Sequence, residues 1–176
     1  GLDGFLMTKH LWGGEDWYVL AGSESDDELT ACAVSPVGEV VVAGYYQDAL
    51  TVDGADVLDP AAGSDALLGM IDPGGIPVFW NALAGPGEDF AYGVDVAEDG
   101  TIFVTGSFEG EATYPGAGLV GEGGESAFLL ALEPDGTLRW PKVIGGAGNA
   151  RALDVAAVSQ SDGAAMVFVT GYFSGR

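Results

Sequence analysis

The sequence contains few of the side chains on which most enzyme chemistry depends. It has a single cysteine, Cys32, and a single histidine, His10. One cysteine excludes an internal disulfide. Because Cys32 lies in the apolar run LTACAV, we expect a small buried side chain rather than a reactive thiol. Nothing in the sequence places it beside His10, so no Cys–His catalytic pair is predicted.

Basic residues are also scarce. Five Lys and Arg stand against 27 Asp and Glu, which gives a formal net charge of −22 at pH 7. Such a chain repels the phosphates of nucleic acids and of anionic membranes, so neither is predicted as a partner. Three interpretations of the charge remain open: solubility, a saline habitat, and a surface that binds cations.

Long apolar runs and helical periodicity are missing as well. No run of 18 apolar residues occurs, so no membrane span is predicted. An apolar content of 48% argues against disorder, and 30 glycines, often beside Asp or Pro, predict frequent turns. Alternating segments rich in β-branched and aromatic residues predict an all-β fold.

The sequence does contain an internal repeat. One strand-like pattern with a central glycine occurs three times, as VVAGYY (41–46), FVTGSF (103–108) and FVTGYF (168–173). The glycines Gly44, Gly106 and Gly171 predict a bulge or a close approach of backbone. Trp17, Trp80 and Trp140 recur with nearly the same period, which predicts core residues at one strand position. Such a period indicates stacked units that cover each other's apolar faces.

Each complete unit is predicted to hold four short strands joined by turns such as AEDG (97–100) and EPDG (133–136). The segments 47–64 and 109–125 are predicted to be long loops. Four antiparallel strands in tandem are typical of a β-propeller blade. The expected division is a half blade at 1–28 (strands three and four), full blades at 29–87 and 88–148, and a half blade at 149–176 (strands one and two).

The ordered motifs EDGTIFVTGSF (98–108), GESAFLLALEPDGTLRW (124–140) and IGGAG (144–148), with a second copy before them, resemble the bacterial SBBP-type β-propeller repeat. Ser126 departs from that pattern, which has Asp there, as Asp65 and Asp3 do. The resemblance implies closed propellers on extracellular, cell-surface or periplasmic bacterial proteins. It implies no catalytic residues, and therefore a non-catalytic recognition or scaffold module.

The strands amount to about three blades, whereas propellers typically close with four to eight. Two explanations are open. The chain is part of a larger propeller, or chains assemble head to tail, with the strands at 151–173 pairing with those at 3–20 of the next chain. Two copies would then form a six-bladed ring, a homo-oligomer closed by shared blades.

Loops on a rigid scaffold commonly carry recognition, so we expect a partner-binding face on the loops 47–64, 84–91, 109–125 and 145–151. Its candidate residues for a cationic, carbohydrate or protein partner are Asp48, Asp53, Asp56, Glu88, Asp89, Glu109, Glu111 and Tyr114. The alternative function is a carbohydrate-active hydrolase or lyase that uses carboxylates of this face.

No cofactor is predicted apart from calcium, for which the sequence offers one acidic segment. GSESDDE (22–28) brings together Glu24, Asp26 and Asp27, and calcium prefers closely spaced oxygen ligands. Asp95 lies within an apolar strand, where we expect it to bond backbone amides of the adjacent blade rather than to catalyse with Asp154.

Overall fold

The computed structural model describes residues 1–9, 11, 13, 16–59, 62–159 and 165–175. These residues form fourteen β-strands, and none of them is helical, so the all-β expectation is confirmed. No helix that could span a membrane occurs among them. His10 lies outside the described residues.

The strands form four antiparallel sheets, which we number in chain order. The first sheet has the order β1 (Gly4–Met7), β2 (Tyr18–Gly22), β5 (Leu50–Val52), β6 (Ala55–Leu58). The second has the order β3 (Glu28–Val34), β4 (Val40–Tyr46), β7 (Asp65–Ile71), β8 (Pro77–Leu83).

The third sheet repeats the arrangement of the second. Its order is β9 (Phe90–Val96), β10 (Ile102–Tyr114), β11 (Ala117–Leu132), β12 (Leu138–Ile144). The fourth sheet has only two strands in the described part of the chain, β13 (Ala150–Ser159) and β14 (Ala165–Phe173), which correspond to the first two strands of the complete sheets.

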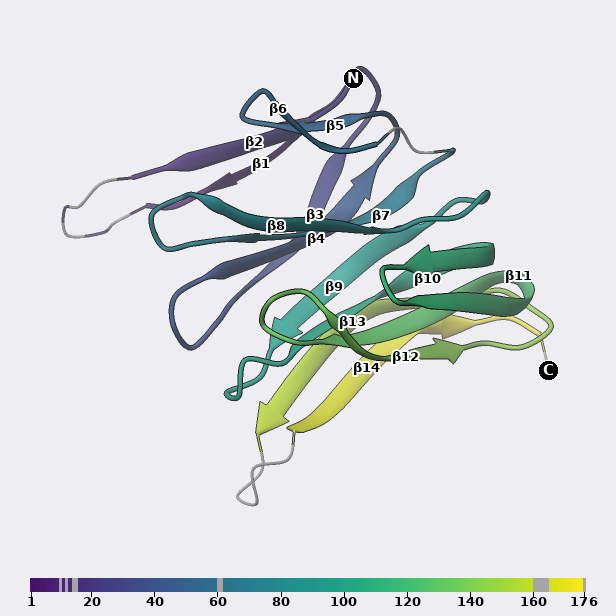
Figure 1. The fold of residues 1–176 in the computed structure, drawn as a ribbon. Coiled ribbons are helices and arrows are strands. Elements are labelled where there is room, and N and C mark those ends of the chain that lie inside the picture. Colours follow the sequence, from purple (N-terminus) through teal and green to yellow (C-terminus); the bar gives the residue numbers. More distant parts are fainter. Residues whose placement is uncertain (10, 12, 14–15, 60–61, 160–164, 176) are drawn as a thin grey trace.

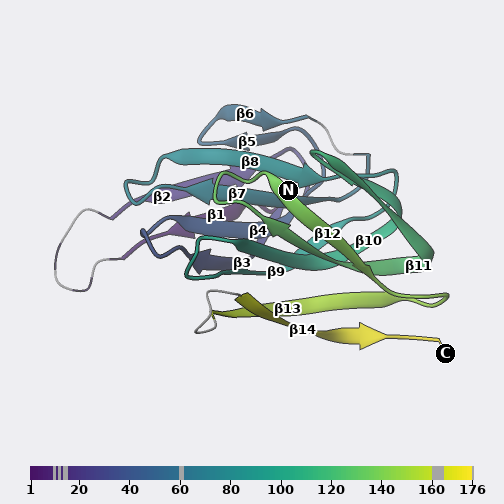
Figure 2. The same cartoon turned by 60° about the horizontal axis from the view of Figure 1, so that its bottom comes forward.

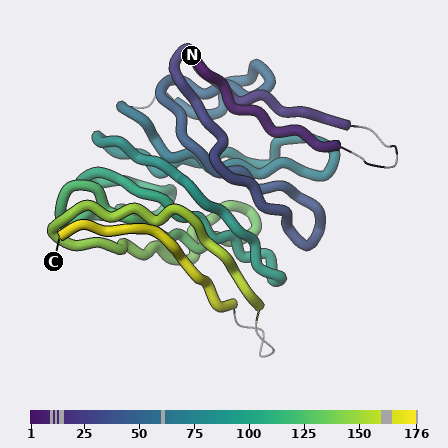
Figure 3. The backbone as a smooth tube through the Cα atoms, turned by 180° about the vertical axis from the view of Figure 1, so that it is seen from behind, coloured from purple at the N-terminus to yellow at the C-terminus, as the bar shows by residue number. Residues whose placement is uncertain are grey.

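The sheets stack face to face in chain order. The first and fourth sheets lie at opposite ends of the stack, with the N- and C-termini in the end sheets (Figures 1 and 3). Figure 2 shows the layers from the side, with β5 and β6 at the top and β13 and β14 at the bottom. Each layer therefore packs against its neighbours in the sequence.

An apolar core fills each space between neighbouring sheets. Val19, Leu67 and Ile71 lie between the first and second sheets, and Met70 and Phe128 between the second and third. A smaller core that includes Phe103, Ala131 and Val155 joins the third and fourth. Strand β7 is buried along its whole length because both of its faces are covered. This explains why the matching strands are apolar at every position rather than alternating.

Strand pairing shows which residues occupy corresponding places in different sheets. The pair Gly4–Ala21 of the first sheet corresponds to Ala66–Leu83 of the second and to Ala127–Ile144 of the third. We call residues at corresponding places equivalent, so Gly4, Ala66 and Ala127 are equivalent. The next residues along these strands, Phe5, Leu67 and Phe128, are therefore equivalent as well.

The three repeated glycines mark the same irregularity in three sheets. Next to Gly44, Gly106 and Gly171, the pairing of strand one with strand two shifts by one residue. A Cβ at any of them would meet the carbonyl oxygen of the facing strand. The prediction of a bulge with a close backbone approach is therefore confirmed.

The segments predicted to be long loops contain strands instead. Residues 50–58 form the hairpin β5–β6, which pairs with β2 of the preceding sheet. Residues 111–120 extend β10 and β11 beyond a bulge at Gly110, and Thr113 bridges to Ala84 just after β8. The β5–β6 hairpin therefore belongs to the first sheet, while the extension of β10 and β11 bridges the third sheet to the end of β8 in the second.

The tryptophan period does not place three rings at one structural position. Pairing makes Trp17, Phe79 and Trp140 equivalent, whereas Trp80 lies one residue further on. Trp80 packs over Gly69 in the core between the first and second sheets, on the opposite face of its sheet from Phe79. A shift of one residue moves a side chain to the other face of a strand, which explains the error.

Cys32 is exposed, contrary to the prediction of a buried thiol. Its equivalent in the third sheet is Val94, which is buried against the second sheet. The first sheet has no counterparts of strands one and two among the described residues, so none of those residues covers Cys32.

Replacing Gly106 with Ala tests the close packing around these glycines. The added Cβ would lie 2.8 Å from the Phe128 ring, and we expect the free energy of unfolding to fall by about 3 kcal/mol. Gly118→Ala is the matched control, since no heavy atom lies within 4 Å of its added Cβ, and its effect should stay within about 0.5 kcal/mol. Equal denaturant midpoints for the two variants would contradict the packing described here.

Candidate functional site

The eight residues predicted for a loop face do not gather into one site. Asp48, Asp53 and Asp56 belong to the β5–β6 segment. Asp53, at the tip of that hairpin, accepts a hydrogen bond from the Leu20 amide at 3.1 Å and donates its own amide to the Leu20 carbonyl at 3.0 Å. Asp53 therefore fastens the hairpin to β2, while Asp56 is exposed on β6.

Tyr114 is a core residue rather than a surface ligand-binding residue. Its side chain is 1% exposed, and its hydroxyl donates to the Gly136 carbonyl at 2.8 Å and lies 3.1 Å from the Asn81 amide nitrogen. Burial raises its pKa to about 12. Tyr114 holds the tip of the β10–β11 hairpin against the second sheet.

The other four predicted residues lie at the junction of the second and third sheets. Glu88, Glu109 and Glu111 reach the surface there, whereas Asp89 is completely buried. The Asp89 Oδ1 atom accepts the Glu109 amide at 3.3 Å, and its Oδ2 atom has no hydrogen-bond partner among the described residues. Asp65 is buried nearby and accepts the Gly85 amide at 3.4 Å.

Burial is the main reason why these two carboxyl groups resist ionisation. It raises the pKa of Asp89 to about 7, with smaller contributions from the charges of Asp65, Glu109 and Glu88. Burial also raises the pKa of Asp65. Near neutral pH, Asp89 is therefore close to the midpoint of its titration.

The position of Asp89 recurs in all three units, which indicates a structural role. Asp27, Asp89 and Asn149 each stand before the first strand of a sheet. Their side-chain oxygens accept backbone amides from Gln47 at 3.1 Å, Glu109 at 3.3 Å and Glu125 at 3.3 Å. The bond of Asn149 differs in its partner, because Glu125 lies on β11 of the sheet before, whereas Gln47 and Glu109 lie at strand two of the sheets that Asp27 and Asp89 begin.

Two carboxylates of the predicted calcium segment accept hydrogen bonds from backbone amides. Asp27 accepts the Ser23 amide at 2.5 Å, and Asp26 accepts the Leu2 amide at 2.9 Å. Over the described ranges, no group of three or more acidic, cysteine or histidine side chains is arranged to hold a metal ion. Calcium at Glu24, Asp26 and Asp27 stays a prediction.

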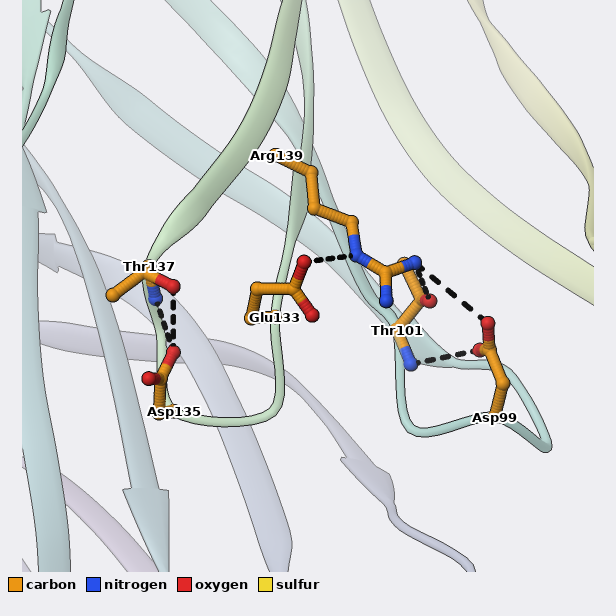
Figure 4. Close-up of polar contacts among 6 residues, drawn as sticks. All are labelled: Asp99, Thr101, Glu133, Asp135, Thr137 and Arg139. Atoms are coloured by element: carbon orange, nitrogen blue, oxygen red, sulfur yellow. Dashed lines mark hydrogen bonds and ion pairs between the residues drawn. The ribbon is translucent and has the colours of Figure 1, made fainter.

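A polar cluster ties together two turns at one end of the third sheet (Figure 4). Arg139 donates to Glu133 at 2.6 Å and to Thr101 at 2.7 Å. Asp99 and Asp135 accept the amides of Thr101 and Thr137, and hydrogen bonds from these threonines lower the pKa of each carboxyl. The acids of both turns are thus explained by local hydrogen bonding.

Asp95 has the structural role expected from the sequence. Its Oδ2 atom accepts the Ala157 amide of the fourth sheet at 2.7 Å. A second polar tie joins the same sheets, because Arg151 forms an ion pair with the buried Glu125 at 2.6 Å. These two contacts hold the two-stranded fourth sheet to the third.

An apolar gap lies between the third and fourth sheets, and we call it the fourth-sheet gap. It has a volume of about 640 Å³, and its apolar lining includes Ala127, Ile144, Ala152 and Val169. The sequence does not predict this gap, because the gap depends on the fourth sheet having two strands among the described residues.

The chain matches no known family model and no curated protein sequence.

Replacing Asp89 with Asn tests its titration. The unfolded chain gives up the Asp89 proton near pH 4 and the folded chain near pH 7, so rising pH should destabilise the wild type across that interval. The side chain of the Asp89→Asn variant cannot ionise, and its amide oxygen still offers an acceptor for the Glu109 amide. The stability of the wild type relative to the variant should fall by on the order of 3 to 4 kcal/mol between pH 4 and pH 7.5.

Chemical denaturation at several pH values measures this difference. Asp65 titrates in both proteins, and only its interaction with the Asp89 charge differs between them. Asp56→Asn, on the exposed hairpin, is the control and should not change the pH dependence. A constant difference between wild type and Asp89→Asn across the interval would show that Asp89 titrates normally.

Proposed function

We propose that this chain is a non-catalytic scaffold and recognition module built from β-propeller blades, and that further sheets complete its two outer faces. One observation carries the proposal. The outer faces of the first and fourth sheets expose apolar side chains at places that are buried in the inner sheets.

On the first sheet, the outer face consists of Phe5, Met7, Tyr18 and Leu20, all exposed. Phe5 is 65% exposed, whereas its equivalents Leu67 and Phe128 are each 1% exposed, because a preceding sheet covers them. The face of the first sheet has the composition of an interior surface.

The outer face of the fourth sheet has the same character on the other side. Phe168 is 53% exposed, while its equivalents Val41 and Phe103 are buried against the following sheet. Tyr172 is also exposed, and its equivalent Tyr45 contacts Phe90 of the next sheet edge to face, with ring centroids 5.1 Å apart.

The two end sheets also have open strand edges beside their exposed apolar faces. Strand β1 is an edge of the first sheet and β14 an edge of the fourth. An unpaired edge with an apolar face is a template for another strand.

The surface carboxylates Glu88, Glu109 and Glu111 support a recognition surface for a protein or carbohydrate partner. The resemblance to SBBP repeats supports an extracellular, cell-surface or periplasmic location.

Sedimentation velocity tests whether the outer faces bind other sheets. We expect the wild type to form discrete oligomers, and Phe168→Asp to shift it to the 17.9-kDa monomer by placing a charge on the outer face. Val37→Asp, at an exposed apolar residue in a turn of the second sheet, is the control and should leave the oligomer intact. A wild type that remains monomeric at about 100 µM would contradict the proposal.

A further inference from the structure

We propose that the fourth-sheet gap is the binding site for strand β1 of a second copy of this chain, with Phe5 of that copy filling the apolar space. The inference rests on the proposed function and names the partner. The chain itself carries both halves of one four-stranded sheet. Strands β13 and β14 correspond to strands one and two, and β1 and β2 correspond to strands three and four.

The existing sheets define how the two halves would pair. In the second sheet, Gly44 of β4 lies opposite Leu67 of β7, and in the third, Gly106 of β10 lies opposite Phe128 of β11. The equivalent of these glycines in the fourth sheet is Gly171. Its partner across the new edge is therefore Phe5, in an antiparallel pairing of β14 with β1.

The apolar space has a filled counterpart one interface earlier. Ala127, Ile144, Ala152 and Val169 of the fourth-sheet gap are equivalent to Ala66, Leu83, Ala91 and Val104. Those four residues surround a space of only about 10 Å³, because Phe128, Leu130 and Tyr114 occupy the rest. Phe5 and Met7 are the equivalents of Phe128 and Leu130, and both are exposed.

Glycine at position 171 suits an incoming ring. A Cβ at Gly106 would lie 2.8 Å from the Phe128 ring, so the absence of a side chain there admits the ring. Gly171 leaves the same room on β14. The fourth-sheet gap thus offers apolar space opposite Gly171, where an aromatic ring such as that of Phe5 would lie.

The same pairing of β14 with β1 also provides a partner for the exposed ring of Trp140. Trp17 donates its indole N–H to the Pro73 carbonyl at 3.0 Å, and Gly75 of that turn packs on its ring. Trp140, the equivalent of Trp17, is 42% exposed because no such turn follows among the described residues. The turn glycine at the equivalent place in the first sheet is Gly13, which has φ +93° like Gly75 at +87°. After docking of β1, Gly13 would take the place beside Trp140 that Gly75 takes beside Trp17.

The same docking covers Cys32 of the second copy. The equivalents of Cys32 are Val94 and Val155, each buried against the strands of the preceding sheet. In the assembly, the outer face of the fourth sheet takes the place of that preceding sheet. The exposed thiol therefore reports on the interface without any added label.

Two copies joined in this way at both ends have two-fold symmetry and no unpaired β1 or β14 edge. Each copy carries a net charge of −22, so the copies repel one another over a distance that salt shortens. Association should therefore strengthen with ionic strength, as expected for an apolar interface between anions.

Two variants and the native thiol test the inference. Phe5→Asp places a charge in the apolar space and should raise the dissociation constant at least 100-fold by light scattering, while Val37→Asp should change it less than threefold. Cys32 should react with Ellman's reagent at least tenfold more slowly in the associated wild type than in Phe5→Asp. Circular dichroism checks that Phe5→Asp is folded, as expected for an exposed position.

Cross-linking tests the register. With Cys32→Ser in both chains, mixing Leu6→Cys with Thr170→Cys should give a disulfide-linked pair, because the equivalent residues Leu129 and Thr105 are paired in the third sheet. Leu6→Cys mixed with Ala165→Cys, at the far end of β14, should not.

The outcomes separate the two levels of the proposal. Oligomers that persist in Phe5→Asp, with Cys32 equally reactive in both proteins, would overturn the docking of β1 and leave the proposed function standing. A wild type that is monomeric at high protein and salt concentration would overturn both.

Discussion

The structure depends on the covering of sheets that are apolar on both faces. Strand β7, between two neighbouring sheets, is buried at every residue, and β11 is buried throughout the part that pairs with β12. The equivalent strand β1 has one neighbouring sheet and exposes Phe5 and Met7. The same kind of side chain is therefore core or surface according to its place in the stack, and the two ends of the stack differ from its interior in lacking a neighbour.

The sequence predicted the strands and turns well because each depends on local residues. Gly106 within FVTGSF and Asp99 within AEDG determine a bulge and a turn without reference to the rest of the chain. The hairpins at 50–58 and 111–120 were missed because their strands are short and lie among turn-forming residues. Cys32 was misplaced because its exposure depends on strands that the first sheet does not contain.

The candidate site was predictable only in part. The loop positions predicted one face for all eight residues, of which four lie at one junction, but they could not show that Asp89 and Tyr114 point into the core while Glu88 and Glu109 remain at the surface. The Asp–Asp–Asn series at 27, 89 and 149 was visible in the sequence at matching places in the repeat. Its role emerged only once each side chain was seen to accept a backbone amide, from a later segment at Asp27 and Asp89 and from an earlier one at Asn149. Some acidic residues of the chain, such as Asp27 and Asp89, are therefore buried and bind backbone amides, while others are exposed to solvent.

Small-angle X-ray scattering of the wild type in high salt tests most directly whether the stack is completed by a second copy. If β1 docks on β14 of a second copy, the forward-scattering mass equals two 17.9-kDa chains and the particle is closed and nearly equidimensional. A mass of one chain at every concentration, with the profile of the open stack in Figure 1, would contradict it.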